Sequence, residues 1–267
     1  MGLELISYNA ERIYKRLFYT IGESEHYIIS YPKTGRTWLR YLLGNYIIDK
    51  YSLSQNFIGD TDYLCWKAKI PKIKFRHSGS FVYSSSSDLE IDFDSKSKSF
   101  EDTKLVFLTR NPYDTLVSSY YHYKYREGKY LDDISSFVRD DFLGIPRFVS
   151  FHNAWHERIM DSERTLLISY EEMKESAERV LKSVLMFFDF NDVNSQKVKF
   201  SVSKSSFDNM QKIEIKNRKN DFLTNMGSDE TSMKTRKGKV GGYLKELKQE
   251  DIDYISNYIE SNQIKSI

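Results

Sequence analysis

Four short apolar segments recur along the chain, and three of them lead into segments whose apolar residues follow helical spacing. Strands buried on both faces of a sheet appear as continuous apolar runs, and strands alternating with helices are typical of βαβ units. The predicted strands cover residues 27–31, 73–77, 104–109 and 165–170; the predicted helices begin near Thr37, follow Pro112 and cover residues 177–188. The sequence therefore predicts an α/β fold in which a central, mostly parallel sheet is flanked by helices.

Length and composition favour one domain over residues 1–267. The chain is 40% hydrophobic and 29% charged, which suits a soluble globular protein with a large core. Its net charge of +2 gives no general attraction for nucleic acid.

No segment approaches the roughly 18 apolar residues that a membrane span needs. Cys65 is the single cysteine, so an intramolecular disulfide is excluded. We expect a cytoplasmic protein without nucleic-acid or membrane partners. Polar composition predicts an exposed loop over residues 84–99 and a mobile basic segment over residues 212–239.

A phosphate-binding loop is predicted between the first strand and its helix, where the sequence reads YPKTGRTW. A turn at this point directs backbone N–H groups and the positive end of the helix toward one place. The loop adds two cations, two hydroxyls and a glycine that permits close approach of a ligand. Its residues are Lys33, Thr34, Gly35, Arg36, Thr37 and Trp38. The loop is P-loop-like in this physical sense, although the pattern GxxxxGK[ST] is absent. An ordinary basic turn beside a core tryptophan is the alternative.

Two further basic segments could bind the same ligand. Arg110 ends the third predicted strand, where open α/β sheets bind ligands, and its guanidinium suits bidentate phosphate binding. Ser118, in the next helix, adds a hydroxyl. The alternative is that Arg110 pairs with Asp114 in a solvated turn. The second segment combines adjacent cations with a glycine as a flexible clamp, or is a solvated loop: Arg236, Lys237 and Gly238.

In their order, these motifs resemble those of the cytosolic-type sulfotransferase family, which uses 3′-phosphoadenosine 5′-phosphosulfate (PAPS). The family motif YPKSGNTWLR appears here as YPKTGRTWLR, RNPxDxxVSxYxH as RNPYDTLVSSYYH, and RKGxxGDW as RKGKVGGY. The segment SYEEMK, residues 169–174, is similar to the family's YEDMK. The resemblance covers about residues 27–247, and it implies a transferase that sulfates a small molecule.

The resemblance also implies a role for each matching position. Residues 33–38 are expected to hold the 5′-phosphosulfate, with Trp38 stacked on adenine. The 3′-phosphate is assigned to Arg110, Ser118, Arg236, Lys237 and Gly238. Tyr170 matches a tyrosine that contacts adenine, and Ser206 and Phe207 match a further nucleotide-contacting segment; core aromatic residues are the alternative for Tyr170 and Phe207.

His77 is the candidate general base, because the family carries a histidine on a strand between its first two motifs. Imidazole can accept the acceptor's hydroxyl proton as the new S–O bond forms. Lys33 is expected to stabilise the leaving phosphate, and Ser118 to hold Lys33 until an acceptor arrives. No metal is expected, since lysines and arginines can supply the positive charge; a metal at His152 and His156 would lack a third ligand. A hydrogen-bonded core histidine is the alternative for His77. The other histidines, His122 among them, are interpreted as structural.

Departures from the family pattern occur at three places. Arg36 replaces a small residue, Lys234 and Thr235 replace an apolar pair, and Gly242 and Tyr243 replace Asp-Trp. The family's dimer motif KxxxTVxxxE is absent from residues 245–260, so an oligomer is not indicated.

Acidic and aromatic residues between Gln55 and Asp102 suggest a polar acceptor, such as a cationic amine, because aromatic faces and carboxylates attract cations. The residues are Phe57, Asp60, Asp62, Tyr63, Trp66, Phe81, Tyr83, Asp88, Glu90, Asp92 and Asp94. The alternative is that these acids belong to a solvated loop far from the pocket. Two rival functions remain open at this point, a nucleotide-dependent kinase and a non-catalytic nucleotide-binding module.

Overall fold

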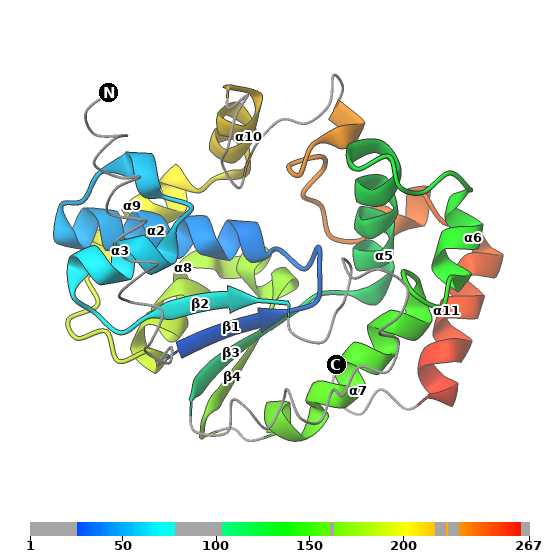
Figure 1. The fold of residues 1–267 in the computed structure, drawn as a ribbon, viewed down its shortest axis with the longest axis horizontal. Helices are drawn as coiled ribbons and strands as arrows, with labels where there is room; N and C mark the ends of the chain where they lie inside the picture. The colour runs from blue at the N-terminus through cyan, green and yellow to red at the C-terminus, as the bar shows by residue number, and fades with distance from the viewer. Residues whose placement is uncertain (1–25, 78–102, 161–162, 217–222, 224–229, 263–267) are drawn as a thin grey trace.

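A four-stranded parallel sheet lies between two groups of helices in the computed structural model, which describes residues 26–77, 103–160, 163–216, 223 and 230–262 (Figure 1). The strand order is β2-β1-β3-β4. The strands are β1 (His26–Ser30), β2 (Ile73–Arg76), β3 (Lys104–Thr109) and β4 (Thr165–Ser169). The register places Ile28 of β1 opposite Phe75 and Val106. The predicted α/β fold is confirmed, and each strand lies within one residue of its predicted bounds.

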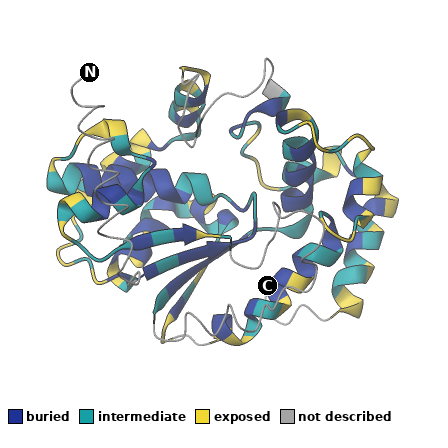
Figure 2. Ribbon diagram, in the orientation of Figure 1, coloured by how far each residue is buried: buried dark blue, intermediate teal, exposed yellow. Residues whose placement is uncertain are grey.

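Both faces of the sheet are buried, as the continuous apolar strands predict (Figure 2). Successive side chains alternate between faces, so Ile28 and Val106 join one core cluster while Ile29 and Phe107 join the other. The first cluster is formed with α2 (Arg36–Tyr51), α3 (Thr61–Ala68), α8 (Tyr170–Phe187) and α9 (Ser195–Lys204). The second is formed with α5 (Pro112–Tyr121), α6 (Ile134–Arg139), α7 (Ile145–Met160) and α11 (Gln249–Ser261).

Two helices begin directly after strands, at sequence signals that fix their first turns. Asn111 caps α5 by accepting a hydrogen bond from the backbone N–H of Asp114, with Pro112 in the first turn. Ser169 and Glu172 form a capping box at the start of α8. The helix therefore begins seven residues before its predicted start, and Tyr170 lies at the junction of strand and helix.

The predicted mobile segment over residues 212–239 is wrong for its three described parts, which include the fully buried Leu223. Residues 212–216 belong to α10 (Phe207–Lys216), in which Glu214 is fully buried. Residues 230–239 begin with the short helix η3 (Glu230–Ser232), and Ser232 and Thr235 are also buried. Buried polar groups hold this segment, so a hydrophobic pattern could not reveal it. The predicted loop over residues 84–99 lies outside the described residues.

The remaining short elements are η1 (Gln55–Phe57), η2 (His122–Arg126) and η4 (Gly242–Lys245). Of these, η2 continues α5 as one π-helical turn. All four strands point the same way, so the residues that follow them gather at one edge of the sheet. Within the described residues, no helix is long and apolar enough to cross a membrane.

Candidate functional site

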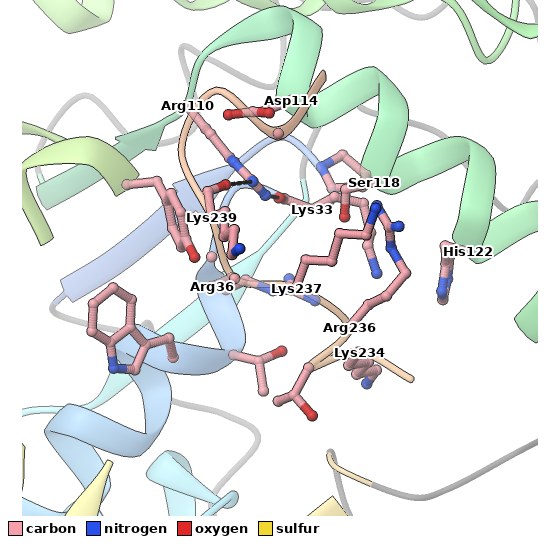
Figure 3. Close-up of a pocket in the computed structure, with 18 of the residues that line it drawn as sticks. Lys33, Arg36, Arg110, Asp114, Ser118, His122, Lys234, Arg236, Lys237 and Lys239 are labelled. Atoms are coloured by element: carbon pink, nitrogen blue, oxygen red, sulfur yellow. Dashed lines mark hydrogen bonds between the residues drawn. The ribbon is translucent and has the colours of Figure 1, made fainter. Parts of the chain in front are cut away.

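A pocket opens at the carboxyl-terminal edge of the sheet and brings the sequence motifs together (Figure 3). Its volume is about 310 Å³, at the lower end of the roughly 300–1,000 Å³ typical of small-molecule sites. Predicted site residues that line it are Lys33, Gly35, Arg36, Thr37, Trp38, His77, Arg110, Ser118, Tyr170, Phe207, Arg236, Lys237 and Gly238. Segments up to 200 residues apart in the sequence therefore build one site.

The loop between β1 and α2 is held in a tight turn. Lys33 and Gly35 both have positive φ angles, 71° and 101°. The hydroxyl of Thr34 donates to the carbonyl oxygen of Tyr31 at 2.8 Å. A Cβ atom at Gly35 would lie 2.6 Å from the Tyr170 ring, so only glycine lets the loop pack under that ring. The loop is thus shaped by its own hydrogen bond and by Tyr170.

Arg110 links the first motif to the third. Its guanidinium donates to the carbonyl oxygens of Lys33 at 3.0 Å and Lys239 at 3.3 Å, and lies 4.3 Å from the centre of the Tyr170 ring. Asp114, the partner of Arg110 in the alternative interpretation, has other contacts. The Asp114 carboxylate accepts hydrogen bonds from the backbone of Gly241 at 2.7 Å and of Tyr243. Asp114 therefore anchors the glycine-containing loop against α5.

The third motif is ordered by a carboxylate and an aromatic ring. Glu246 bonds to Arg236 at 3.3 Å and also to Lys237. The Arg236 guanidinium lies 3.7 Å from the centre of the Tyr121 ring. Glu246 therefore orders both cations, although the side chain of Lys237 is still 48% exposed.

Aromatic residues also line the pocket, next to the basic motifs. The Trp38 and Tyr170 rings pack edge to face, with centroids 5.8 Å apart. The position of Gly238 leaves no room for a side chain, because a Cβ there would lie 2.5 Å from the Phe207 ring. These rings offer flat surfaces of the kind on which a nucleobase stacks.

His77 follows β2 and is fixed by one hydrogen bond. Its Nδ1 lies 2.7 Å from the carbonyl oxygen of Ser30 and donates to it, which leaves Nε2 unprotonated in the neutral ring. Burial, followed by the charge of Arg36, lowers the pKa of His77 to about 3. The ring is therefore neutral at pH 7, with an acceptor nitrogen.

Lys33 is the most perturbed cation of the site. Burial lowers its pKa to about 7, and the charges of Lys234 and Arg126 act in the same direction. Burial also lowers the pKa of Lys234 to about 8. Burial is the larger cause in both lysines, and nearby cations add to it.

Two predicted site residues do not line the pocket. Thr34 is fully buried and its hydroxyl is used within the turn, so this residue does not face the pocket. The hydroxyl of Ser206 accepts a hydrogen bond from the backbone of Asn209 at the start of α10. Both hydroxyls stabilise local structure, as serine and threonine often do at turns and helix starts.

Sequence reasoning missed several lining residues. His122, interpreted as structural, lines the pocket, and its Nε2 lies 3.0 Å from Glu127. Burial and the charge of Lys33 lower the pKa of His122 to about 2. The other missed residues include Tyr123, Lys174, Leu223 and Lys234. Signals were present for two of them, because His122 ends the second motif and Lys234 departs from the family pattern.

A metal site is not formed by the described residues, among which no group of three or more His, Cys, Asp and Glu side chains could hold an ion. His152 is buried, and its Nδ1 lies 2.8 Å from the carbonyl oxygen of Phe148. That contact is a structural one within α7.

The sequence of this chain is similar to the sequences of known proteins. The sequence matches the sulfotransferase domain family over residues 23–266. It is 24% identical to the cytosolic sulfotransferase 12 of Arabidopsis thaliana over 258 residues, which cover 89% of this chain and 77% of that relative. It is 25% identical to the cytosolic sulfotransferase 15 of the same plant over 170 residues, 59% of this chain; the match spans less than half of that relative, 45%.

A solved structure has the same fold. The crystal structure of mouse sulfotransferase SULT7A1 complexed with PAP superimposes with a TM-score of 0.64 at 20% sequence identity. The match covers 92% of this chain and 86% of the mouse chain. The likeness extends the match from sequence motifs to the arrangement of the strands and helices.

Proposed function

Because the chain belongs to the sulfotransferase domain family, we propose that it transfers a sulfuryl group from PAPS to a hydroxyl or amine of a small molecule. One observation carries the proposal: the three basic motifs and His77 line a single pocket. The proposal covers one domain over residues 1–267, a cytoplasmic location and no metal.

The cations divide between the two charged ends of the nucleotide. Lys33, Arg36 and the amino end of α2 suit the 5′-phosphosulfate. Arg110, Arg236 and Lys237 suit the 3′-phosphate, with Ser118 and Gly238 as hydrogen-bond donors. The adenine is assigned to the aromatic surfaces of Trp38, Tyr170 and Phe207.

His77 acts as the general base in the proposed reaction. The acceptor's hydroxyl proton passes to Nε2 as the acceptor oxygen bonds to sulfur and the bond from sulfur to the bridging phosphate oxygen breaks. Lys33 stabilises charge on the leaving oxygen, and Ser118 holds Lys33 before an acceptor arrives. The low pKa of His77 in the ligand-free protein reflects burial and then Arg36. A bound polyanion would offset the charge of Arg36 and make the imidazole a stronger base.

The cationic acceptor stays a prediction. Asp60, one of its proposed carboxylates, accepts a hydrogen bond from the backbone of Tyr63 at 3.0 Å and caps α3. Neither Asp60 nor Asp62 lines the pocket. The four acids from Asp88 to Asp94 lie outside the described residues.

Nucleotide binding tests the proposal. PAP (adenosine 3′,5′-bisphosphate) is expected to raise the Tm, because a ligand that binds the folded state stabilises it by about 2.7 kcal/mol at 100 times its Kd. Adenosine 5′-phosphosulfate should raise it far less, since it lacks the 3′-phosphate. Thermal melts with both nucleotides, and with ATP plus Mg²⁺, make the measurement. Equal shifts from PAP and adenosine 5′-phosphosulfate would contradict the assigned clamp, and a larger shift from ATP would favour a kinase.

Nucleotide binding is also expected to take up protons. At pH 8 Lys33, with a pKa of about 7, is mostly neutral in the ligand-free protein. A bound phosphate favours the charged lysine, raises its pKa and draws a proton from solution. Calorimetry of PAP binding in Hepes and Tris at pH 8 should show a buffer-dependent enthalpy equivalent to about one proton. Lys33→Met should reduce this uptake, and equal enthalpies in the two buffers for the wild-type protein would exclude it.

A further inference from the structure

Lys174 is a cation that lines the pocket and has no role in the proposed function. It lies in the first turn of α8, four residues after Tyr170, and residues at this spacing share one face of a helix. A kink at Ser176, whose backbone angles are φ −151° and ψ 85°, separates this turn from the rest of α8. The turn that carries Tyr170 therefore also directs Lys174 toward the pocket.

The acids closest to Lys174 in this turn have other partners. Glu171 accepts a hydrogen bond from the backbone N–H of Asn111 at 3.2 Å. Glu175 forms an ion pair with Arg179 at 3.5 Å. Neither carboxylate pairs with Lys174 in the described part of the chain, so the ammonium is available to the pocket.

The side chain of Lys174 extends over the ring of Trp38. The distance from Nζ to the ring centre is 5.8 Å, and no hydrogen bond or ion pair to a described residue accompanies this contact. Asp114, the one acid among the described lining residues, accepts hydrogen bonds from the third motif instead. An indole ring attracts a cation only weakly at an exposed site such as Lys174, so a ligand can replace this contact.

The contact with Trp38 places Lys174 at the base end of the proposed nucleotide. The Trp38 ring packs edge to face with Tyr170, and the Arg110 guanidinium lies 4.3 Å from the centre of the Tyr170 ring. Two aromatic rings thus separate Lys174 from Arg110, which is assigned to the 3′-phosphate. A base stacked on Trp38 would have its ring centre roughly 4.5–7 Å away, the range in which the ammonium already lies. The base and the ammonium must therefore be neighbours.

Adenine offers hydrogen-bond acceptors to a neighbouring ammonium. Its ring nitrogens N1, N3 and N7 carry lone pairs, whereas a lysine ammonium has three N–H donors and no acceptor. The flexible four-carbon stem of Lys174 allows the ammonium to move from the face of Trp38 to the edge of a bound base while α8 stays in place.

We propose that Lys174 is a nucleotide-binding residue, which leaves the face of Trp38 when PAPS binds and donates a hydrogen bond to a ring nitrogen of adenine. This inference rests on the proposed function and adds a polar contact to its aromatic base site. The transfer step itself is unchanged.

Calorimetric titrations with two ligands test whether Lys174 contacts the base. PAP and methyl ribofuranoside 3,5-bisphosphate carry the same two phosphates, but the second compound lacks the base. Lys174→Met should weaken PAP binding about fivefold, as expected for the loss of one contact worth about 1 kcal/mol. The same variant should leave the Kd of the base-free compound unchanged. Lys182→Met is the matched control for the lost charge, because Lys182 lies in α8 but does not line the pocket.

Analogues of PAP in which N1, N3 or N7 is replaced by C–H identify the acceptor. One of the three should bind the wild-type protein about fivefold more weakly than PAP, and should bind Lys174→Met as tightly as PAP does. Equal losses of PAP and the base-free compound in Lys174→Met would assign Lys174 to a phosphate and overturn the inference. An unchanged Kd for PAP in Lys174→Met, or equal Kd values for PAP and all three analogues, would also overturn it. A wild-type protein that binds no PAP would contradict the proposed function itself.

Discussion

Replacing His77 with alanine is expected to lower turnover by about 10² or more, the usual contribution of a general base. The hydrogen bond from Nδ1 to Ser30 leaves Nε2 as the proton acceptor. The proposed nucleotide contacts do not include this ring, so the Kd for PAP should change little. Single-turnover rates with saturating PAPS and calorimetric PAP binding separate the two effects.

His122 supplies the matched control, because it is a second neutral histidine in the same pocket. Its Nε2 is held by Glu127. The variant His122→Gln should therefore keep turnover within about tenfold of wild type. A larger loss in His122→Gln than in His77→Ala would move the general base to His122.

Replacing Glu214 with leucine is expected to lower the free energy of unfolding by about 3–5 kcal/mol, the cost of leaving one partner of a buried ion pair alone. Both side chains are almost inaccessible, with exposures of 4% for Arg126 and 0% for Glu214. The loss also removes the acceptor for the backbone of Lys234 and Thr235. Urea denaturation of the wild-type and variant proteins measures the change in the free energy of unfolding.

The double variant Glu214→Leu/Arg126→Met controls for the buried charge. Removing both charges should recover part of the lost stability, since replacing a buried pair with apolar residues is often neutral. Recovery should be incomplete, because the two backbone N–H groups still lack their acceptor. A double variant less stable than Glu214→Leu alone would show that the unpaired Arg126 is not the cause.

The sheet was predictable from sequence because its signals are local. Each strand is a continuous apolar run, and Asn111 and Pro112 mark the helix that follows β3. Parallel strands place the residues that follow them at one edge of the sheet. The sequence therefore predicts that Lys33 and Arg110 lie close together.

Contacts between distant segments were not predictable in this way. Arg126 and Glu214 are 88 residues apart, and nothing in either local sequence marks them as a pair. That pair orders the basic segment around Lys234, which composition alone predicts to be mobile. Thr34 was predicted to bind phosphate because its hydroxyl could donate a hydrogen bond to one. In the structure that hydroxyl donates to the carbonyl oxygen of Tyr31 instead.

Glu246 has a consequence for how fast the site could turn over. Its carboxylate already occupies Arg236 and Lys237, the cations that the proposed clamp offers to the 3′-phosphate. An incoming nucleotide must share these cations with Glu246 or displace it, so the free energy of binding the phosphate is partly offset by weakening two existing ion pairs. The same carboxylate can recapture the cations as the product leaves, which lowers the barrier to release. Where product release limits turnover, Glu246 would lower the affinity for the nucleotide and raise the turnover rate.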